Sequence, residues 1–309
     1  MKIAMVGVGG VGGYFGAKLA QSGADVTFVA RGATAGALRS NGIRVESIAG
    51  NFSVPHIRVR DERSPGEEFD AVLIAVKAWQ LPDAIASIRL LLGRDTLVVP
   101  LLNGVEAPEL LSRELGQEHV AGGLSAIVAW AAAPGVIRHA GADPTIMFGE
   151  LDNRRSDRCE SLLGILRSAG ITAELPPDIQ RSMWTKFAFI TPMSGIGGVT
   201  RVPVGIWRTT PETRAMAIAA VKEVAAVAAA RGIALDADLI PLTMSRYDGL
   251  PPDATASLQR DVMSGRPSEL EAQLGAVVRL GAESGVVTQL HAFMYHALLP
   301  GERLVRKNG

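Results

Sequence analysis

A glycine-rich segment near the start of this sequence has the residue types and spacing to hold a phosphate. Gly7-Val8-Gly9-Gly10-Val11-Gly12 matches the pattern G-x-G-x-x-G, between an apolar run and a helical pattern. The first glycine permits a tight turn, the second lets a pyrophosphate approach the backbone, and the third lets a helix pack closely on a strand. The start of that helix then offers free N–H groups to an anion. The segment therefore predicts a dinucleotide site, and an ordinary glycine-rich turn is the alternative.

The residue at the end of the second expected strand decides which dinucleotide this would be. An NAD site usually has a carboxylate about 20 residues beyond the glycines, which binds the ribose 2′-hydroxyl. This sequence has Arg31 at that place, nineteen residues after Gly12. A guanidinium attracts a 2′-phosphate, whereas a carboxylate would repel it. Arg31 therefore predicts NADP(H) as the cofactor, and an arginine that only caps the strand in solvent is the alternative.

Two more polar residues directly follow apolar runs. Lys77 follows the run 71–76, and Asn103 follows the run 97–102. Ligands of open α/β sheets bind beyond the carboxyl ends of the strands. We therefore expect Lys77 near the cofactor and Asn103 hydrogen-bonded to the nicotinamide or to a substrate oxygen. A surface lysine and a turn asparagine are the alternatives.

Further candidates for chemistry lie on helical patterns in the second half of the chain. Lys186 could donate a proton to a carbonyl under reduction if burial lowered its pKa toward the working range. Ser257 and Asp261 are four residues apart and so share one helical face, and Glu269 begins a later pattern. Single charged residues on amphipathic helices are usually solvated, so these residues gain a role only in combination.

The elements that must position these residues alternate in the first half of the chain. Short apolar runs without polar alternation are typical of strands in a parallel sheet that is covered on both faces. With helices between them, they predict a doubly wound, Rossmann-type α/β domain over residues 1–176. We expect strands at 3–6, 25–30, 71–76, 97–102, 145–148 and 171–174, and helices at 14–22 and 157–168.

After Leu175-Pro176-Pro177 the pattern is helical throughout. The double proline is the expected linker, so residues 177–309 would form an all-helical domain that binds substrate and carries the catalytic residues. Ser268 and Glu271 have the spacing of a capping box, which would start a helix there. We expect helices at 179–189, 212–231, 255–264 and 268–284.

Composition and charge exclude several classes of protein. The 31 Lys+Arg balance 31 Asp+Glu, so the chain lacks the basic excess that nucleic acids and membrane surfaces require. No apolar stretch reaches the roughly 20 residues of a membrane helix. One cysteine and five scattered histidines predict neither a disulfide nor a metal site. We therefore expect a cytoplasmic protein with a small-molecule partner, and the Ala-rich helix 213–231 leaves a homodimer open.

Taken together, these residues resemble one enzyme family, the ketopantoate reductases (2-dehydropantoate 2-reductases). The likeness covers essentially the whole chain, and its segments occur in the family's order and spacing. That makes the set far more specific than any single motif. The segments are Gly7-Val8-Gly9-Gly10-Val11-Gly12, Arg31, Val76-Lys77-Ala78-Trp79-Gln80, Leu102-Asn103-Gly104, Pro134-Gly135-Val136-Ile137-Arg138-His139, Trp184-x-Lys186 and Ser257-x3-Asp261-x7-Glu269.

The resemblance implies a reaction and a role for each matching residue. The family reduces 2-dehydropantoate to pantoate with NADPH, on the route to pantothenate and coenzyme A, between a Rossmann domain and a helical domain. By position, Lys186 would be the general acid that polarises the carbonyl, and Glu269 would support catalysis. Asn103 and Ser257 would hold substrate, and Arg31 would take the 2′-phosphate.

The sequence departs from the family pattern where amides are common. Family members often have Asn four and eight residues after the catalytic lysine, and this chain has Ile190 and Ser194 there. A third Asn, in a later segment, is replaced by Leu274. A polar substrate group left unpaired typically costs about 1–3 kcal/mol. These substrate-binding positions therefore predict a substrate preference shifted by tens-fold.

Three other functions stay open from the sequence alone. The same machinery could reduce another 2-oxo acid with a more apolar tail, as Ile190 suggests. A non-catalytic NADP(H)-binding sensor would fit the lost amides, although the presence of Lys186 and Glu269 argues against it. A flavin enzyme is a third alternative, because flavoproteins also use G-x-G-x-x-G.

Overall fold

The computed structural model describes residues 1–61, 64 and 66–308, and the chain divides into two compact units. The first unit contains Met1–Leu102 and Ala107–Ile179, and the second contains Asn103–Glu106 and Gln180–Gly309. The short segment Asn103–Glu106 thus belongs to the second unit, although residues on both sides of it belong to the first. The domain boundary expected at residues 176 and 177 remains a prediction from the sequence.

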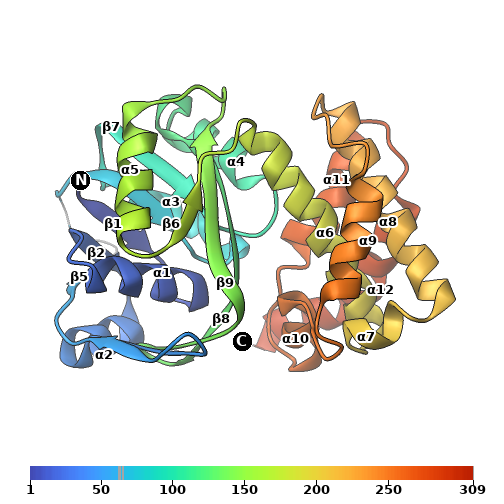
Figure 1. The fold of residues 1–309 in the computed structure, drawn as a ribbon, viewed down its shortest axis with the longest axis horizontal. Helices are drawn as coiled ribbons and strands as arrows, with labels where there is room; N and C mark the ends of the chain where they lie inside the picture. Colours follow the sequence, from blue (N-terminus) through green and yellow to red (C-terminus); the bar gives the residue numbers. More distant parts are fainter. Residues whose placement is uncertain (62–63, 65, 309) are drawn as a thin grey trace. The chain divides into compact units, whose positions relative to one another are not determined.

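The first unit contains a parallel five-stranded sheet in the order β5-β2-β1-β6-β7 (Figure 1). β1 lies in the middle, where Ile3 pairs with Val26 of β2 on one side and with Ala71 of β6 on the other. The strands are β1 (Ile3–Val6), β2 (Val26–Val29), β5 (Arg58–Arg60), β6 (Phe69–Ile74) and β7 (Leu92–Pro100).

Alternate residues of these strands enter two separate cores. Met5 and Leu73 pack in one core with helices α1 and α5, whereas Val6 and Ile74 pack in the other with α3 and α4. Strands covered on both faces must be apolar at successive positions, and this confirms the α/β domain predicted from the continuous apolar runs. The helices of this unit are α1 (Gly10–Gln21), α2 (Gly32–Asn41), α3 (Leu81–Arg89), α4 (Ala107–Leu115) and α5 (Asp157–Ser168), with single turns η1 (Ala78–Gln80) and η2 (Gln117–His119).

A second sheet in the same unit has the order β10-β9-β3-β4, and β8 pairs with β9 as a long antiparallel hairpin (Figure 1). Pro134 and Gly135 form the hairpin turn, where Gly135 has φ +75°. The strands expected at 145–148 and 171–174 both lie in this second sheet, paired through Thr145 and Thr172. Its strands are β3 (Ile43–Ser47), β4 (Phe52–Val54), β8 (Ala121–Ala133), β9 (Val136–Glu150) and β10 (Thr172–Glu174).

The second unit is helical, as the sequence predicts. Its longest helix, α6, continues well past the predicted end at residue 189 and contains Pro192. The Tyr247 hydroxyl donates a hydrogen bond to the Phe189 carbonyl in the turn that precedes this proline (2.6 Å). The helices are α6 (Ile179–Thr200), α7 (Val204–Trp207), α8 (Pro211–Ala230), α9 (Leu239–Gly249), α10 (Ser257–Met263), α11 (Ala276–Glu283) and α12 (Gln289–Asn308), with a π turn η3 (Glu271–Gly275) before α11.

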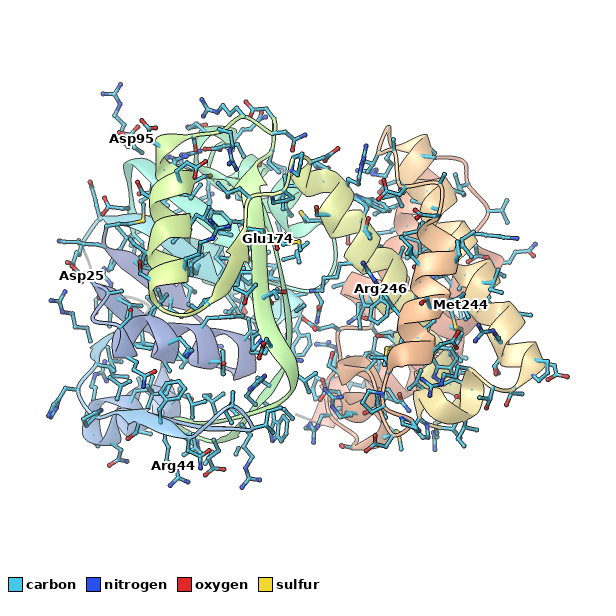
Figure 2. The ribbon with its side chains drawn as sticks, viewed as in Figure 1. Asp25, Arg44, Asp95, Glu174, Met244 and Arg246 are labelled. Carbon is cyan, nitrogen blue, oxygen red and sulfur yellow. The ribbon has the colours of Figure 1, made fainter. Side chains whose placement is uncertain are left out.

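Helix α9 shows how these helices combine a buried and an exposed face. Met244 is buried and Arg246 is exposed on the same helix (Figure 2). Tyr247, one turn after Thr243, is fully buried between Phe189 and Trp207. Within the described part of the chain, no helix is both long enough and apolar enough to cross a membrane.

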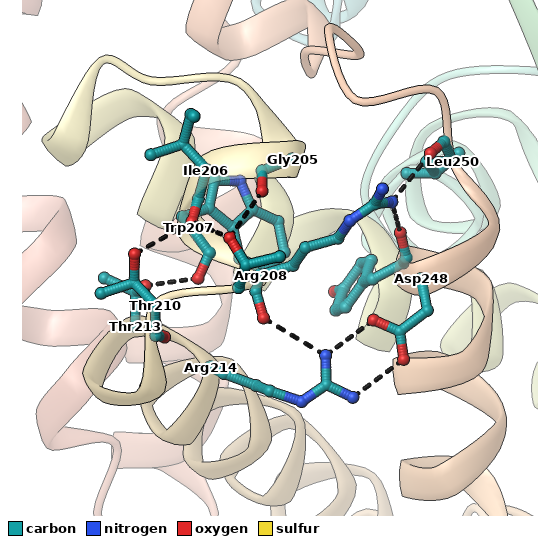
Figure 3. A network of polar contacts seen from close by, with 11 residues as sticks. Gly205, Ile206, Trp207, Arg208, Thr210, Thr213, Arg214, Asp248 and Leu250 are labelled. Atoms are coloured by element: carbon teal, nitrogen blue, oxygen red, sulfur yellow. Dashed lines mark hydrogen bonds and ion pairs between the residues drawn. The ribbon is translucent and has the colours of Figure 1, made fainter.

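A network of arginines fastens α7, α8 and α9 together (Figure 3). Arg208 donates to the carbonyls of Tyr247 and Leu250 at the end of α9 (2.5 and 2.7 Å). Arg214 binds both carboxylate oxygens of Asp248 (2.7 and 2.8 Å). The two Arg208 bonds reach carbonyls at the C-terminal end of α9, where the regular helical hydrogen bonds stop.

The predicted capping box at Ser268 and Glu271 is wrong. The backbone N–H and the hydroxyl of Ser268 both donate to Glu302 of α12. Glu271 instead accepts hydrogen bonds from Tyr295 and Arg279. A capping box requires both side chains to bond to the nearby backbone. Here both bond to side chains of other elements instead.

Candidate active site

The glycine segment has the geometry that a pyrophosphate requires. Gly7 has φ +90°, which a residue with a side chain rarely adopts, and it ends β1 in a tight turn. A Cβ at Gly12 would collide with the Gly7 carbonyl, so only glycine lets α1 start so close to the strand. A Cβ at Gly9 would meet no described atom within 4 Å, so the space beside this residue is open. A dinucleotide phosphate therefore fits the segment.

Arg31 and Lys77 both follow parallel strands at their carboxyl ends. Arg31 is exposed and is the residue before α2, two positions after β2 ends. Lys77 stands three residues beyond β6, and its backbone N–H donates to the side chain of Gln80 (3.0 Å). Its ammonium lies 5.7 Å from the centre of the Trp79 ring. Arg60 of β5, which sequence reasoning missed, pairs with Val29 of β2 and is a second arginine at that edge, where its guanidinium donates to the Ser64 carbonyl.

In the helical unit, Asn103 joins Lys186 to Glu269. The Asn103 amide oxygen accepts a hydrogen bond from Lys186 Nζ (3.2 Å). The Asn103 amide nitrogen donates to Glu269 Oε2 (2.8 Å). Glu269 is buried, and the chain of contacts places a lysine ammonium, an amide and a carboxylate side by side. The three residues come from α6, from the segment after β7 and from the turn before η3.

The lysine of this cluster has an unusual acidity. Burial lowers the pKa of Lys186 from its ordinary value near 10.5 to about 8, although the charge of Glu269 acts in the opposite direction. Desolvation disfavours the charged ammonium, and a nearby carboxylate favours it. A lysine with this pKa can hold a proton at neutral pH and also release it, as a general acid must.

Three contacts hold the Asn103 segment on the helical unit. Val105 packs against the apolar cluster that contains Trp184 and Phe187. Glu106 forms an ion pair with Arg279 of α11 (2.7 Å). Gly104, at φ +95°, passes so close to η3 that a Cβ would lie 2.7 Å from the Ala272 carbonyl oxygen. The amide of Asn103 is therefore positioned by its neighbours on both the apolar and the polar side.

Ser268, the residue before Glu269, is held by α12. The buried carboxylate of Glu302 accepts hydrogen bonds from the Ser268 backbone N–H (3.0 Å) and hydroxyl (2.6 Å). Arg306 donates to the Ser268 carbonyl (2.8 Å) and pairs with Glu302. No local pattern in the sequence marks Glu302, Arg306, Glu106 or Arg279 as site residues. Ser268 lies 34 and 38 residues from Glu302 and Arg306, and Glu106 lies 173 residues from Arg279.

The remaining predicted substrate residues also lie in the helical unit. Ile190 is one turn and Ser194 two turns after Lys186 on α6, where Ile190 is half-buried and Ser194 fully buried. Ser257 is the first residue of α10, and Asp261 on the same helix binds Arg266 (3.1 Å). Of the predicted catalytic and substrate residues, the described hydrogen bonds join Lys186, Asn103 and Glu269.

Family comparisons place this arrangement in a known group. Residues 3–153 match the model of ketopantoate reductase PanE/ApbA, and residues 178–302 match the model of its C-terminal domain. The chain belongs to the ketopantoate reductase PanE/ApbA family. It is therefore related to a family of oxidoreductases, and the resemblance inferred from the motifs is confirmed.

Individual relatives of the family cover nearly the same length. An oxidoreductase of Bacillus subtilis (strain 168), YkpB, is 31% identical over 87% of this chain and 88% of its own. The 2-dehydropantoate 2-reductase of Nostoc sp. (strain PCC 7120) is 28% identical over 96% of this chain and 94% of its own.

Solved structures agree with the fold over almost every residue. The 2-dehydropantoate 2-reductase of Geobacter metallireducens GS-15 superposes with a TM-score of 0.89 at 29% identity, covering 97% of this chain and 99% of that one. D-mandelate dehydrogenase with NADH and anilino(oxo)acetate superposes with a TM-score of 0.90 at 24% identity, covering 99% of this chain and 100% of that one. At that identity the second likeness shows the fold alone, and the NADH is bound by that dehydrogenase.

Proposed function

We propose that this chain is an NADPH-dependent 2-oxo acid reductase, with 2-dehydropantoate as the favoured substrate. The observation that carries the proposal is the Lys186–Asn103–Glu269 cluster, in which burial lowers the lysine pKa to about 8. In this reading residues 1–176 bind the cofactor, residues 177–309 bind the substrate, and the enzyme acts in the cytoplasm on the route to pantothenate.

Each residue of the cluster would have its own role in the reaction. Bound NADPH would supply the hydride for the 2-oxo carbon. The Lys186 ammonium would polarise the carbonyl oxygen and give it a proton, which leaves a 2-hydroxy acid. Asn103 would keep the ammonium in place, and the Glu269 carboxylate would help the lysine to regain a proton after each turnover. Ser257 and Ser194 would bind the rest of the substrate.

The cofactor would lie along the carboxyl edge of the parallel sheet. The open space beside Gly9 would admit the pyrophosphate, Arg31 would bind the 2′-phosphate, and Lys77 would lie nearby. An anionic phosphate and a guanidinium form a charge-assisted, forked pair. Replacing Arg31 with Ala should therefore raise the KM for NADPH by about tenfold and leave the KM for NADH unchanged. Arg39→Ala, on an exposed residue of the same helix α2, is the matched control.

A second candidate is the reduction of a 2-oxo acid with a more apolar tail. Ile190 and Leu274 favour it, because both are apolar where the family often has amides. Phenylglyoxylate, the 2-oxo acid that corresponds to mandelate, represents this class.

A panel of 2-oxo acids, assayed with NADPH and with NADH side by side, tests both candidates. The proposal expects 2-dehydropantoate with NADPH to give the highest kcat/KM. Faster reduction of phenylglyoxylate would assign the second candidate instead. If no 2-oxo acid is reduced although NADPH binds, the chain is a sensor, and a yellow purified protein would indicate a flavin.

A further inference from the structure

Gln273, in the π turn η3, is fully buried, and its side-chain amide makes no hydrogen bond with the described residues. Neither its amide oxygen nor its amide nitrogen has a partner in the described part of the chain. Gln259 of α10 is equally buried, and its amide nitrogen donates to the Val202 carbonyl (3.0 Å). Buried polar groups are almost always bonded, so an unpaired buried amide needs a partner that is not part of the chain.

The backbone places Gln273 on the same side of its turn as Glu269. The Gln273 N–H donates to the Glu269 carbonyl (3.1 Å), so the two residues are one α-helical turn apart and share a face. The next turn is wider, because the Gly275 N–H donates to the Leu270 carbonyl five residues back (3.0 Å). Such π turns are rare and frequently lie at functional sites.

Ser194 of α6 also has a buried side-chain atom without a partner. It is fully buried, and its Oγ has no partner among the described residues. Thr191 on the same helix does what such hydroxyls usually do and donates to the Phe187 carbonyl four residues back (3.0 Å). Ser194 lies two turns after Lys186, so it is on the same side of α6 as the lysine.

The two unpaired residues lie where α6 and η3 approach each other. A Cβ on Gly195 would stand only 3.0 Å from Cδ2 of Leu274. Gly195 directly follows Ser194, and Leu274 directly follows Gln273. The two segments therefore approach each other beside the unpaired residues.

We propose that Gln273 determines substrate specificity, by hydrogen-bonding with Ser194 to a hydroxyl on the tail of the 2-oxo acid. The inference rests on the proposed function and adds a residue to it. An amide offers both a donor and an acceptor, and a hydroxyl needs both. Gln273 would supply the partner that the apolar residues Ile190 and Leu274 do not offer.

The test compares two substrates that differ by one hydroxyl. 2-Dehydropantoate carries it, and 3,3-dimethyl-2-oxobutanoate has the same carbon skeleton without it. Wild type, Gln273→Leu and Gln259→Leu are assayed with both acids at saturating NADPH, and their melting temperatures are measured without ligand. Gln259→Leu is the matched control, a buried glutamine whose amide is already bonded.

The proposal expects Gln273→Leu to lower kcat/KM for 2-dehydropantoate by about 10- to 100-fold, mainly through KM, and to leave the second acid unchanged. The melting temperature of Gln273→Leu should stay the same or rise, because the substitution removes an unpaired buried amide. Gln259→Leu should melt earlier and keep the ratio of the two substrates.

Two results would overturn the inference while the proposed function stands. One is an unchanged substrate ratio in Gln273→Leu, which would mean that the amide binds only water. The other is an equal loss for both acids with a lower melting temperature, which would assign Gln273 to the fold. If wild type reduces no 2-oxo acid at all, the proposed function fails, and the inference fails with it.

Discussion

The helical unit contains two polar regions that differ in how completely their groups are bonded. In the arginine network of α7, α8 and α9, Arg208 bonds to the carbonyls of Tyr247 and Leu250, and Arg214 bonds to both carboxylate oxygens of Asp248 (Figure 3). Around Lys186, burial depresses the pKa of a lysine, and Gln273 and Ser194 have buried atoms without partners.

This difference distinguishes groups that stabilise the fold from groups that are available to bind a ligand. Polar groups that already have partners in the folded chain gain no further hydrogen bond from a small molecule. A buried polar group without a hydrogen bond lowers the stability of the fold until a bound partner supplies that bond. Substitutions in the first region should therefore change stability and leave turnover intact, and loss of a polar side chain in the second should lower turnover.

The largest expected effect comes from Lys186→Ala. Removing the proton donor should lower kcat by about 10²- to 10⁴-fold. Binding of NADPH, measured by the quenching of protein fluorescence, should stay unchanged, because the glycine segment lies in the other unit. Lys222→Ala, on an exposed lysine of α8, is the control. Equal turnover in Lys186→Ala and wild type would remove the lysine from the mechanism.

The pH profile should show the lysine directly. The protonated ammonium is the form that donates, so kcat/KM for reduction should be level below the pKa of about 8 and fall about tenfold per pH unit above it. The arginine of Lys186→Arg stays protonated over this range. This variant should therefore have a lower kcat/KM and show no fall at alkaline pH. An alkaline limb that persists in Lys186→Arg would assign it to another group.

Gly104→Ala should disturb both stability and turnover. Gly104 and Gly232 both have positive φ, so alanine at either should cost about 1–2 kcal/mol of unfolding free energy. Only at Gly104 would the Cβ meet backbone, at 2.7 Å from the Ala272 carbonyl oxygen. Displacement of Asn103 should lower kcat/KM by about tenfold further. Equal activity in the two variants would show that the position of Asn103 tolerates movement.

The smallest effect is expected from Asp248→Asn in the arginine network. The ion pair with Arg214 is partly exposed, so its loss should lower the unfolding free energy by about 0.5 kcal/mol in a urea titration. Turnover at 25 °C should not change. A loss of turnover without a loss of stability would contradict the division between the two regions.

Local patterns were enough to predict much of the first unit. The strand at 3–6 and the helix at 157–168 have the predicted bounds. Continuous apolar runs specify buried strands, and Ser156 caps the helix by accepting from the Cys159 N–H (3.3 Å). The hairpin β8–β9 was missed, because its Ala- and Gly-rich strands lack a regular alternation and are held by pairing with each other.

The sequence by itself determined the residue types: the glycines with their strand-turn-helix setting, Arg31 after β2, and a lysine, an asparagine and a glutamate with the family's spacing. Only the tertiary structure decided that Asn103 bonds Lys186 and Glu269, which lie 83 and 166 residues farther along the chain. It also decided that Ser268 bonds to Glu302, and that the Gln273 amide has no partner. The reason is that burial and hydrogen bonding depend on all the atoms around a group, and most of those atoms belong to distant residues.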